Sequence, residues 1–351
     1  MQEPKIIIGQ EILKFIAEID EFKGRWTLLK TMSPDRLSQL RKVATIESIG
    51  SSTRIEGAKL SDIQVETLLS NLTTSSFKNR DEQEVAGYAE AMDLVFQAFE
   101  DLRLTENHIR QLHQTLLRHS DKDERHRGDY KTFPNHVVAK DPYGKEIGVV
   151  FETATPFDTP REMEELVKWA SKATDEEAMH PLLIVAVFNV VFLAIHPFQD
   201  GNGRLSRILT TLMLLRMGYD YVPYASLEHV IEDNKDLYYK ALRRTQTSLK
   251  SDKPNWESWL GFFLRCLKKQ KDNLEVKIQE HTPQDDSELP LLSVQVLKLF
   301  NEHDRLTIKE IIALTGANQS TLKLRLRELV NGGLLMRHGK ARATWYSRSD
   351  S

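Results

Sequence analysis

The chain has 351 residues, of which 40% are hydrophobic and 28% are charged, and its formal net charge at pH 7 is -3. This length exceeds one ordinary hydrophobic core, so we expect two or three domains, and the near-neutral charge argues against a chain coated by nucleic acid. The one cysteine, Cys266, excludes an internal disulfide and fits a reducing compartment.

Residues 1–80 form the first expected region, which is helical because Ile12, Leu13, Ile16 and Ile19 share one helix face. The N-terminal residues lack the apolar segment and cleavage site of a signal peptide. The most apolar stretch, residues 182–195, has 14 residues and contains Asn189. It is short for a membrane span and predicts a buried helix. We therefore expect a cytoplasmic protein with no membrane contact.

Residues 81–280 form the second region, a mainly α domain. Two sets of apolar residues keep helical spacing: Val85, Tyr88, Met92, Val95 and Phe99, then Ile109, Leu112, Leu116 and Leu117 behind the N-cap Thr105. The helical pattern is interrupted at residues 128–157, where turn formers and β-branched residues predict a β-hairpin around Asp-Pro-Tyr-Gly. A helix is expected to resume at Pro160.

Residues 290–351 form the third region, after a polar and acidic linker at 280–289. Three helical patterns precede two short strands around Gly339, which predicts a winged helix-turn-helix domain. Exposed polar residues are expected on its recognition helix and wing: Gln319, Ser320, Lys323, Arg327, Arg337, Lys340 and Arg342. These residues could contact DNA. Winged helices also bind proteins or dimerise, and the pattern leaves both roles open.

The most informative stretch is residues 196–207, which read HPFQDGNGRLSR between two apolar helical patterns. Glycines let the backbone approach a ligand, and the N–H groups of a helix start attract anions. Arg204 and Arg207 lie three residues apart, where both could reach phosphate oxygens. Asp200 could hold Mg²⁺, and His196 could take a proton from a hydroxyl.

These residue types together predict a phosphate-binding site with a general base and a metal carboxylate. They do not identify the transferred group. The alternative is a glycine-rich turn between core helices, with a histidine at a helix end and two solvated arginines. That alternative suits any one of these residues, whereas the whole set in one loop favours a site.

The stretch resembles the signature HPFxDGNGRxxR of the Fic family at every specified position, and the resemblance covers about residues 45–265. It implies a helical core with a β-hairpin flap, and AMP transfer from ATP to a Ser, Thr or Tyr hydroxyl of a protein. The roles it implies are His196 as base, Asp200 as Mg²⁺ ligand, and Gly201, Asn202, Gly203, Arg204 and Arg207 as phosphate ligands. The kinase branch of the family has an altered loop, so Gly201 and Gly203 favour AMP transfer.

Three further segments match family features. The hairpin at 128–157 resembles the flap that aligns a target segment by strand pairing, or it is a plain structural hairpin. The segment NKDLYYKALRRTQ resembles the adenine side, with Tyr238 and Gln246 as candidate nucleotide contacts. A tyrosine pair on a helix is, however, often part of a core.

Residues 52–57, STRIEG, resemble the inhibitory motif [S/T]xxxE[G/N] at Ser52, Glu56 and Gly57. Glu56 could pair with Arg207 and deny it to the γ-phosphate of ATP. The resemblance therefore implies a self-inhibited enzyme with ATP, Mg²⁺ and protein substrates, including itself, as partners. Family members of this layout also pair as homodimers.

Two other hypotheses remain open at this stage. The chain could be a DNA-binding regulator whose Fic domain only senses nucleotide, although a sensor would not need His196. Alternatively, the enzyme could transfer UMP or phosphate, or remove AMP.

Overall fold

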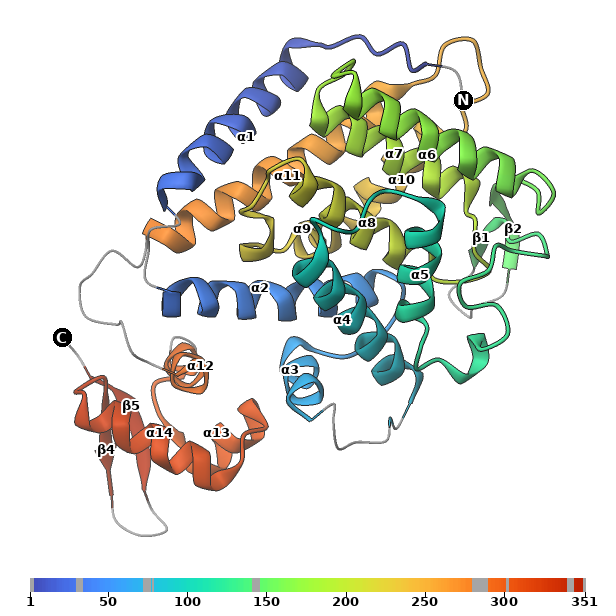
Figure 1. The fold of residues 1–351 in the computed structure, drawn as a ribbon. Coiled ribbons are helices and arrows are strands. Elements are labelled where there is room, and N and C mark those ends of the chain that lie inside the picture. Colours follow the sequence, from blue (N-terminus) through green and yellow to red (C-terminus); the bar gives the residue numbers. More distant parts are fainter. Residues whose placement is uncertain are drawn as a thin grey trace. The chain divides into compact units, whose positions relative to one another are not determined.

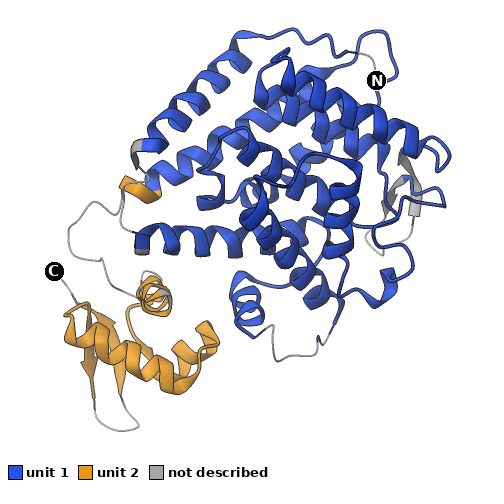
Figure 2. Ribbon diagram, viewed as in Figure 1, with its two compact units in different colours: residues 1–276 blue, residues 277–351 orange. Residues whose placement is uncertain are grey.

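A computed structural model of the chain describes residues 3–29, 34–71, 77, 79–140, 146–279, 290–300, 303–339 and 344–349. It divides into two compact units, residues 1–276 and 277–351 (Figure 2). The boundary that we expect near residue 80 lies inside the first unit, and the three-part division stays a prediction. The expected linker, 280–289, lies outside the described residues.

The first unit is mainly helical, as the apolar spacing predicts (Figure 1). Its helices are α1 (Gln10–Leu29), α2 (Pro34–Ile55), α3 (Asp62–Ser70), α4 (Arg80–Ala98), α5 (Glu106–Leu116), α6 (Thr159–Asp175), α7 (Pro181–Ile195), α8 (Asn202–Arg216), α9 (Leu227–Asp233), α10 (Lys235–Gln246) and α11 (Trp256–Gln279). Short 3-10 turns occupy Asp121–Asp123 and Val222–Tyr224.

Helices α7 and α8 form the centre of the first unit. Almost every side chain of α7 is buried, and so are those of α8 from Asn202 to Leu215. Helix α7 packs against α6 and α8, while α2 packs against α4, α8 and α9. Because α7 is buried on all sides, it can be apolar all round without spanning a membrane. In the described part of the chain, no helix has both the length and the apolar character for a transmembrane segment.

The β-hairpin lies where the sequence predicts it. Strands β1 (Val137–Lys140) and β2 (Glu146–Phe151) pair antiparallel, with Val138 opposite Val149. The predicted turn at 141–144 lies outside the described residues.

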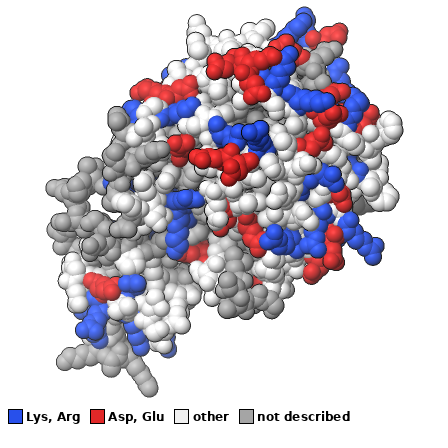
Figure 3. All heavy atoms as spheres, in the orientation of Figure 1, with Lys and Arg blue, Asp and Glu red and all other residues white. Residues whose placement is uncertain are grey.

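On the face drawn in Figure 3, acidic and basic side chains of the first unit alternate without a continuous field of one sign.

The second unit contains α12 (Leu291–Leu299), β3 (Leu306–Thr307), α13 (Ile308–Thr315), α14 (Gln319–Asn331), β4 (Leu335–His338) and β5 (Trp345–Arg348). Its three strands form an antiparallel sheet in the order β3-β5-β4. The sequence predicts only two strands here, and β3 is additional, because a two-residue strand carries no alternating pattern. Residues from all of these elements build one core: Val296, Phe300, Leu306, Ile311, Leu322, Leu326, Leu329, Leu335 and Tyr346.

Candidate active site

The loop 196–201 joins α7 to α8, and a pocket of about 730 Å³ opens over it. The residues expected at a site that line this pocket are Glu56, His196, Asp200, Gly201, Asn202, Gly203, Arg204, Tyr238 and Gln246. The structure thus brings together segments that are far apart in the chain. Among the described residues, the expected site residues Ser52, Gly57 and Arg207 do not line the pocket, although Arg207 is bonded to Glu56, which does.

His196 ends α7 in a left-handed backbone conformation, with φ 54° and ψ 60°. Its Nδ1–H donates to the Leu193 carbonyl at 3.3 Å, which leaves Nε2 as the unprotonated nitrogen of the neutral ring. Burial lowers the pKa of His196 to about 4. The imidazole is therefore neutral near pH 7 and able to accept a proton.

The start of α8 is shaped for close approach by an anion. Gly201 precedes the helix with φ 79°, a conformation that costs glycine little. The Asn202 side chain accepts from the N–H of Phe198 at 2.9 Å and donates to its carbonyl at 2.7 Å, which closes the loop on itself. The first N–H groups of a helix lack helical acceptors and carry partial positive charge. This end of α8 can therefore bind phosphate.

Asp200 lies in a cluster of charges at the pocket. Its Oδ2 accepts from Arg80 Nη2 at 2.8 Å, and its Oδ1 accepts from Arg204 Nη2 at 3.3 Å. Glu84 contacts both arginines, with its Oε1 2.7 Å from Arg80 Nε and its Oε2 3.1 Å from Arg204 Nη1. Although burial opposes ionisation of Asp200, Arg204 and the Gly201 N–H hold its pKa below the ordinary value. Asp200 is thus a carboxylate available to a cation.

A metal ion in this pocket would depend on Asp200 and on its ligand. Within the described ranges, no group of three or more His, Cys, Asp or Glu side chains could hold a metal alone. Mg²⁺ fits such a place, since it is commonly bound by one or two carboxylates together with phosphates and water. The Asp200 side chain is 33% exposed and therefore reachable.

Arg207 is buried and held by two residues from α2 and the turn after it. Its Nε donates to Ser52 Oγ at 2.8 Å, and its Nη2 donates to the Ser52 carbonyl at 2.9 Å. Nη2 also pairs with Glu56 Oε1 at 2.8 Å. The third nitrogen, Nη1, makes no hydrogen bond among the described residues. The Arg207 guanidinium is thus enclosed, and it does not line the pocket while Glu56 is in place.

Glu56 reaches from the turn after α2 to the start of α8. Its side chain is 32% exposed, whereas that of Arg207 is 3% exposed. A β-carbon at Gly203 would overlap the Glu56 carboxylate, so the carboxylate lies against the first turn of α8. A negative charge is favoured there by the helix dipole. Glu56 thus occupies the end of the pocket that suits a phosphate.

The turn that carries Glu56 is fastened to α9 and α10. Arg54 donates to both oxygens of Glu232, at 2.7 and 2.9 Å. The hydroxyl of Tyr239 donates to the Ile55 carbonyl at 3.3 Å, and Lys235 Nζ donates to the Arg54 carbonyl at 3.4 Å. Gly57 follows with φ 109°, which favours glycine at the turn.

Tyr238 and Tyr239 both line the pocket but differ in exposure. Tyr238 is 3% exposed and packs on Trp259 and Phe262, at centroid distances of 5.9 and 6.0 Å, while one part of it lines the pocket. Tyr239 is 40% exposed and lines the same pocket. Gln246, about two turns further along α10, is buried and also lines the pocket. Tyr239 is therefore the more accessible ring.

Several residues of the site carry no sequence signal of their own. Arg80 binds Asp200, and the buried His113 donates from Nε2 to the Asp200 carbonyl at 3.0 Å while its Nδ1 accepts from the Gly128 N–H at 2.9 Å. Burial lowers the pKa of His113 to about 4, which agrees with this neutral tautomer. Lys131 and Asn135 bond the backbone around His196. Only tertiary packing brings these side chains to the loop.

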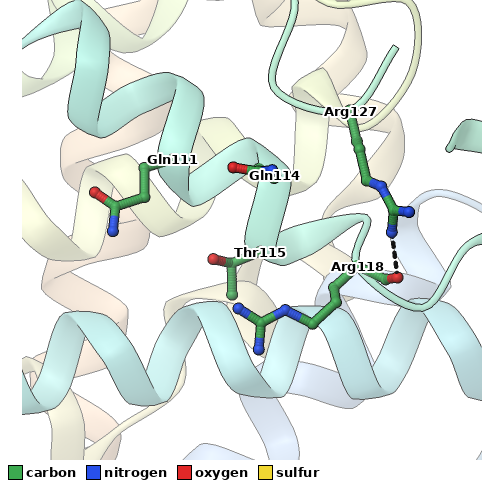
Figure 4. Close-up of a pocket in the computed structure, with 5 residues that line it drawn as sticks. All are labelled: Gln111, Gln114, Thr115, Arg118 and Arg127. Atoms are coloured by element: carbon green, nitrogen blue, oxygen red, sulfur yellow. Dashed lines mark hydrogen bonds between the residues drawn. The ribbon is translucent and has the colours of Figure 1, made fainter. Parts of the chain in front are cut away.

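A second hollow lies outside the loop, lined by Gln111, Gln114, Thr115, Arg118 and Arg127 (Figure 4). Both arginines are already engaged: Arg118 pairs with Glu90 at 2.9 Å, and Arg127 donates to the Arg118 carbonyl at 2.5 Å. This hollow therefore lacks the histidine and the helix start that line the larger pocket.

The comparisons with known proteins agree with the signature loop. The family model described as "Fic/DOC family" matches residues 103–214. Protein adenylyltransferase Fic of Drosophila persimilis is 29% identical over 189 residues, which cover 53% of this chain and 34% of that protein. Its counterpart in Drosophila melanogaster is 28% identical over 185 residues, 52% of this chain and 35% of that protein. The chain thus spans about a third of the length of these relatives.

A solved Fic family protein from Desulfovibrio desulfuricans has a TM-score of 0.64 and 23% identity, and the match covers 100% of this chain and 99% of that one. A Fic domain protein from Bacteroides thetaiotaomicron has a TM-score of 0.62 and 23% identity, covering 77% of this chain and 100% of that one. At this identity the two structures establish a common fold. The family match shows that residues 103–214 of this chain carry a Fic domain.

Proposed function

We propose that this chain is a protein adenylyltransferase that moves AMP from ATP to a hydroxyl of a protein and is restrained by Glu56. One observation carries the proposal: a single pocket is lined by a neutral imidazole, an anion-binding helix start and Asp200. The curated relatives named protein adenylyltransferase Fic support the same chemistry.

In the proposed reaction, a target hydroxyl attacks the α-phosphorus of ATP, and the bond to pyrophosphate breaks. His196 Nε2 takes the hydroxyl proton, since Nδ1–H is committed to the Leu193 carbonyl. A general base of this kind typically contributes about 10²–10⁴-fold to the rate. The start of α8, with Gly203 and Arg204, holds the phosphates.

Asp200 is the proposed ligand of Mg²⁺, which would neutralise charge on the phosphates when bound. Arg80 Nη2 lies 2.8 Å from Asp200 Oδ2, and the Arg80 side chain is 46% exposed. An exposed arginine can withdraw from such a contact at small cost. We therefore expect the ion to compete with Arg80 for the carboxylate.

Glu56 is the proposed brake, acting with Ser52 and Gly57 of its turn. The carboxylate fills the space beside Gly203 and pairs with Arg207, so it opposes a γ-phosphate at the same place by charge and by volume. Removing Glu56 leaves Arg207 with its two bonds to Ser52. The arginine would then stay in place and become available to ATP.

Further parts of the chain have proposed roles that follow from their positions. The hairpin of β1 and β2 would align an extended segment of the target by strand pairing. Tyr238, Tyr239 and Gln246 would contact the adenine ring. The second unit would act as a winged helix that binds DNA, through exposed residues of α14 such as Lys323 and Arg327. Lys340 and Arg342 of the expected wing lie outside the described residues.

The test uses ATP labelled at the α-phosphate, the full-length chain and a cell lysate. The Glu56→Gly chain should label itself and lysate proteins more strongly than the wild-type chain. Parallel reactions with UTP labelled at the same position decide between AMP and UMP transfer. If neither nucleotide labels protein with the Glu56→Gly chain, the proposed activity is wrong and the nucleotide-sensor hypothesis gains.

A further inference from the structure

The backbone at His196 needs support from outside its own loop. His196 is one of two described non-glycine residues with a positive φ, and such a conformation costs about 1–2 kcal/mol for an L-residue. The helix α7 ends immediately before it, so the carbonyl groups from Ile195 onward have no helical donors. Without other donors, these carbonyls would turn toward water and carry the imidazole with them.

One short segment, residues 131–135, bonds four consecutive carbonyls of this stretch. Lys131 Nζ donates to the Ile195 carbonyl at 2.9 Å, and the Lys131 N–H donates to the Pro197 carbonyl at 2.8 Å. Asn135 Nδ2 donates to the carbonyls of His196 and Phe198, at 3.1 and 2.5 Å. The residues on both sides of the imidazole are thus fixed by two side chains and one N–H group.

The ammonium of Lys131 is buried, with the residue 3% exposed. Its other two bonds go to Asn135 Oδ1 at 2.8 Å and Thr153 Oγ1 at 3.0 Å, so all its donors are used. Among the described residues, no carboxylate lies within ion-pair distance of it. A buried cation outside an ion pair is costly. Burial lowers the pKa of Lys131 to about 8, although the charge of Glu162 acts to raise it. A neutral residue would be cheaper if the site needed only packing.

We propose that Lys131, together with Asn135, is the positioning residue of the base: the pair holds the 195–198 backbone so that the His196 ring faces the pocket. The inference rests on the proposed role of His196. The charge of Lys131 has a second effect, since it disfavours a protonated imidazole and helps to keep the His196 pKa low. Glu56 and Asp200 act in the opposite direction from the pocket side, and burial is the largest cause of the low value.

The experiment separates position from charge with three variants in the full-length Glu56→Gly chain. Lys131→Met removes both the donors and the charge, Lys131→Gln keeps a donor without the charge, and Asn135→Ala keeps the charge. The matched control is Lys168→Met, at an exposed lysine of α6 whose ammonium pairs with Glu164 at 2.6 Å. Transfer from labelled ATP gives kcat and KM, and NMR of ¹⁵N-labelled histidine follows the His196 titration, assigned by its loss in His196→Gln.

We expect Lys131→Met to lower kcat at least about tenfold with the KM for ATP within about threefold, since a small misplacement of a base affects the chemical step. The midpoint of the His196 titration should rise by about one pH unit in Lys131→Met and in Lys131→Gln, because a like charge has gone. Asn135→Ala should lower kcat without raising the midpoint. The control should match its parent in both readouts.

An unchanged His196 midpoint in both Lys131 variants, or an unchanged kcat, overturns the proposal. If Lys131→Met does not fold, as judged by thermal unfolding, Lys131→Gln and Asn135→Ala still decide it. Failure of the proposed function is a different result: the Glu56→Gly parent would then transfer no label, while the NMR titration would still report on the effect of Lys131.

Discussion

On the α8 side of the pocket, the loop is fixed by buried side chains: Asn202 bonds the N–H and carbonyl of Phe198, and His113 donates to the Asp200 carbonyl. On the α2 side, Glu56 is about one-third exposed and reaches the site by an ion pair to Arg207. Arg207 itself keeps two further bonds to the buried Ser52. The proposed catalytic side therefore does not depend on Glu56, so removing the proposed brake should leave the catalytic residues in place.

The largest expected effect concerns His196, on the α8 side of the pocket. In the Glu56→Gly background, His196→Ala should lower the rate of label transfer about 10²–10⁴-fold, because the hydroxyl loses its base. ATP affinity, measured by isothermal titration calorimetry, should change by no more than a few fold. Undiminished transfer by His196→Ala would mean that the imidazole is not the base.

The metal prediction comes next in size. Excess chelator should reduce transfer about a hundredfold or more, since a bound cation is worth several kcal/mol of charge stabilisation. Arg80→Ala should lower the Mg²⁺ concentration needed for half-maximal rate, because Asp200 loses a competing partner at 2.8 Å. Full activity in excess chelator would contradict the assignment of Asp200.

Glu56→Gly tests the α2 side of the pocket, which carries the proposed brake. If the partly exposed ion pair is worth about 1.4 kcal/mol, its loss would change the fraction of enzyme that binds ATP productively about tenfold. Self-labelling should therefore rise about tenfold. The matched control is Glu176→Gly, at another exposed glutamate that caps a helix end and does not line the pocket. Arg207→Ala combined with Glu56→Gly should stay inactive, since the same arginine would serve both states. Equal labelling by Glu56→Gly and wild type would show that residues 52–57 are not a brake.

The smallest effect concerns the second unit. If α14 binds DNA, affinity should fall with salt, and Lys323→Ala or Arg327→Ala should each reduce the slope of log K against log salt by about 0.9. Gel shifts of the full chain with duplex DNA measure this, with Lys168→Ala as the control. No binding at low salt with any sequence would favour a protein-interaction role.

The sequence predicts the signature loop well because its parts are contiguous. His196, Asp200, Gly203 and Arg204 lie within one helix–loop–helix segment, so local geometry alone places them at one pocket. Strand β3 could not be predicted, because a strand of two residues is too short to show the alternation of apolar and polar side chains. Most apolar residues used to predict the helices lie in the core, such as Ile109 and Leu112, whereas Leu13 is 60% exposed.

The supporting side chains could not be predicted, since their contacts cross long stretches of chain. Lys131 is 64 residues from Ile195, and Ser52 is 155 residues from Arg207. The exposure of Tyr238 and Tyr239 could not be predicted either. Packing of α10 against Trp259 decides which of the two rings is buried, and residue spacing along the chain does not show this packing. Buried polar side chains in particular carry no periodic signal of their own.

AMP transfer is tested most directly in the Glu56→Gly chain, with ATP labelled at either the α- or the γ-phosphate. AMP transfer predicts protein label from the α-position, none from the γ-position, and none from either when His196→Ala is added. Label from the γ-position would contradict AMP transfer, because it would show that phosphate is transferred instead.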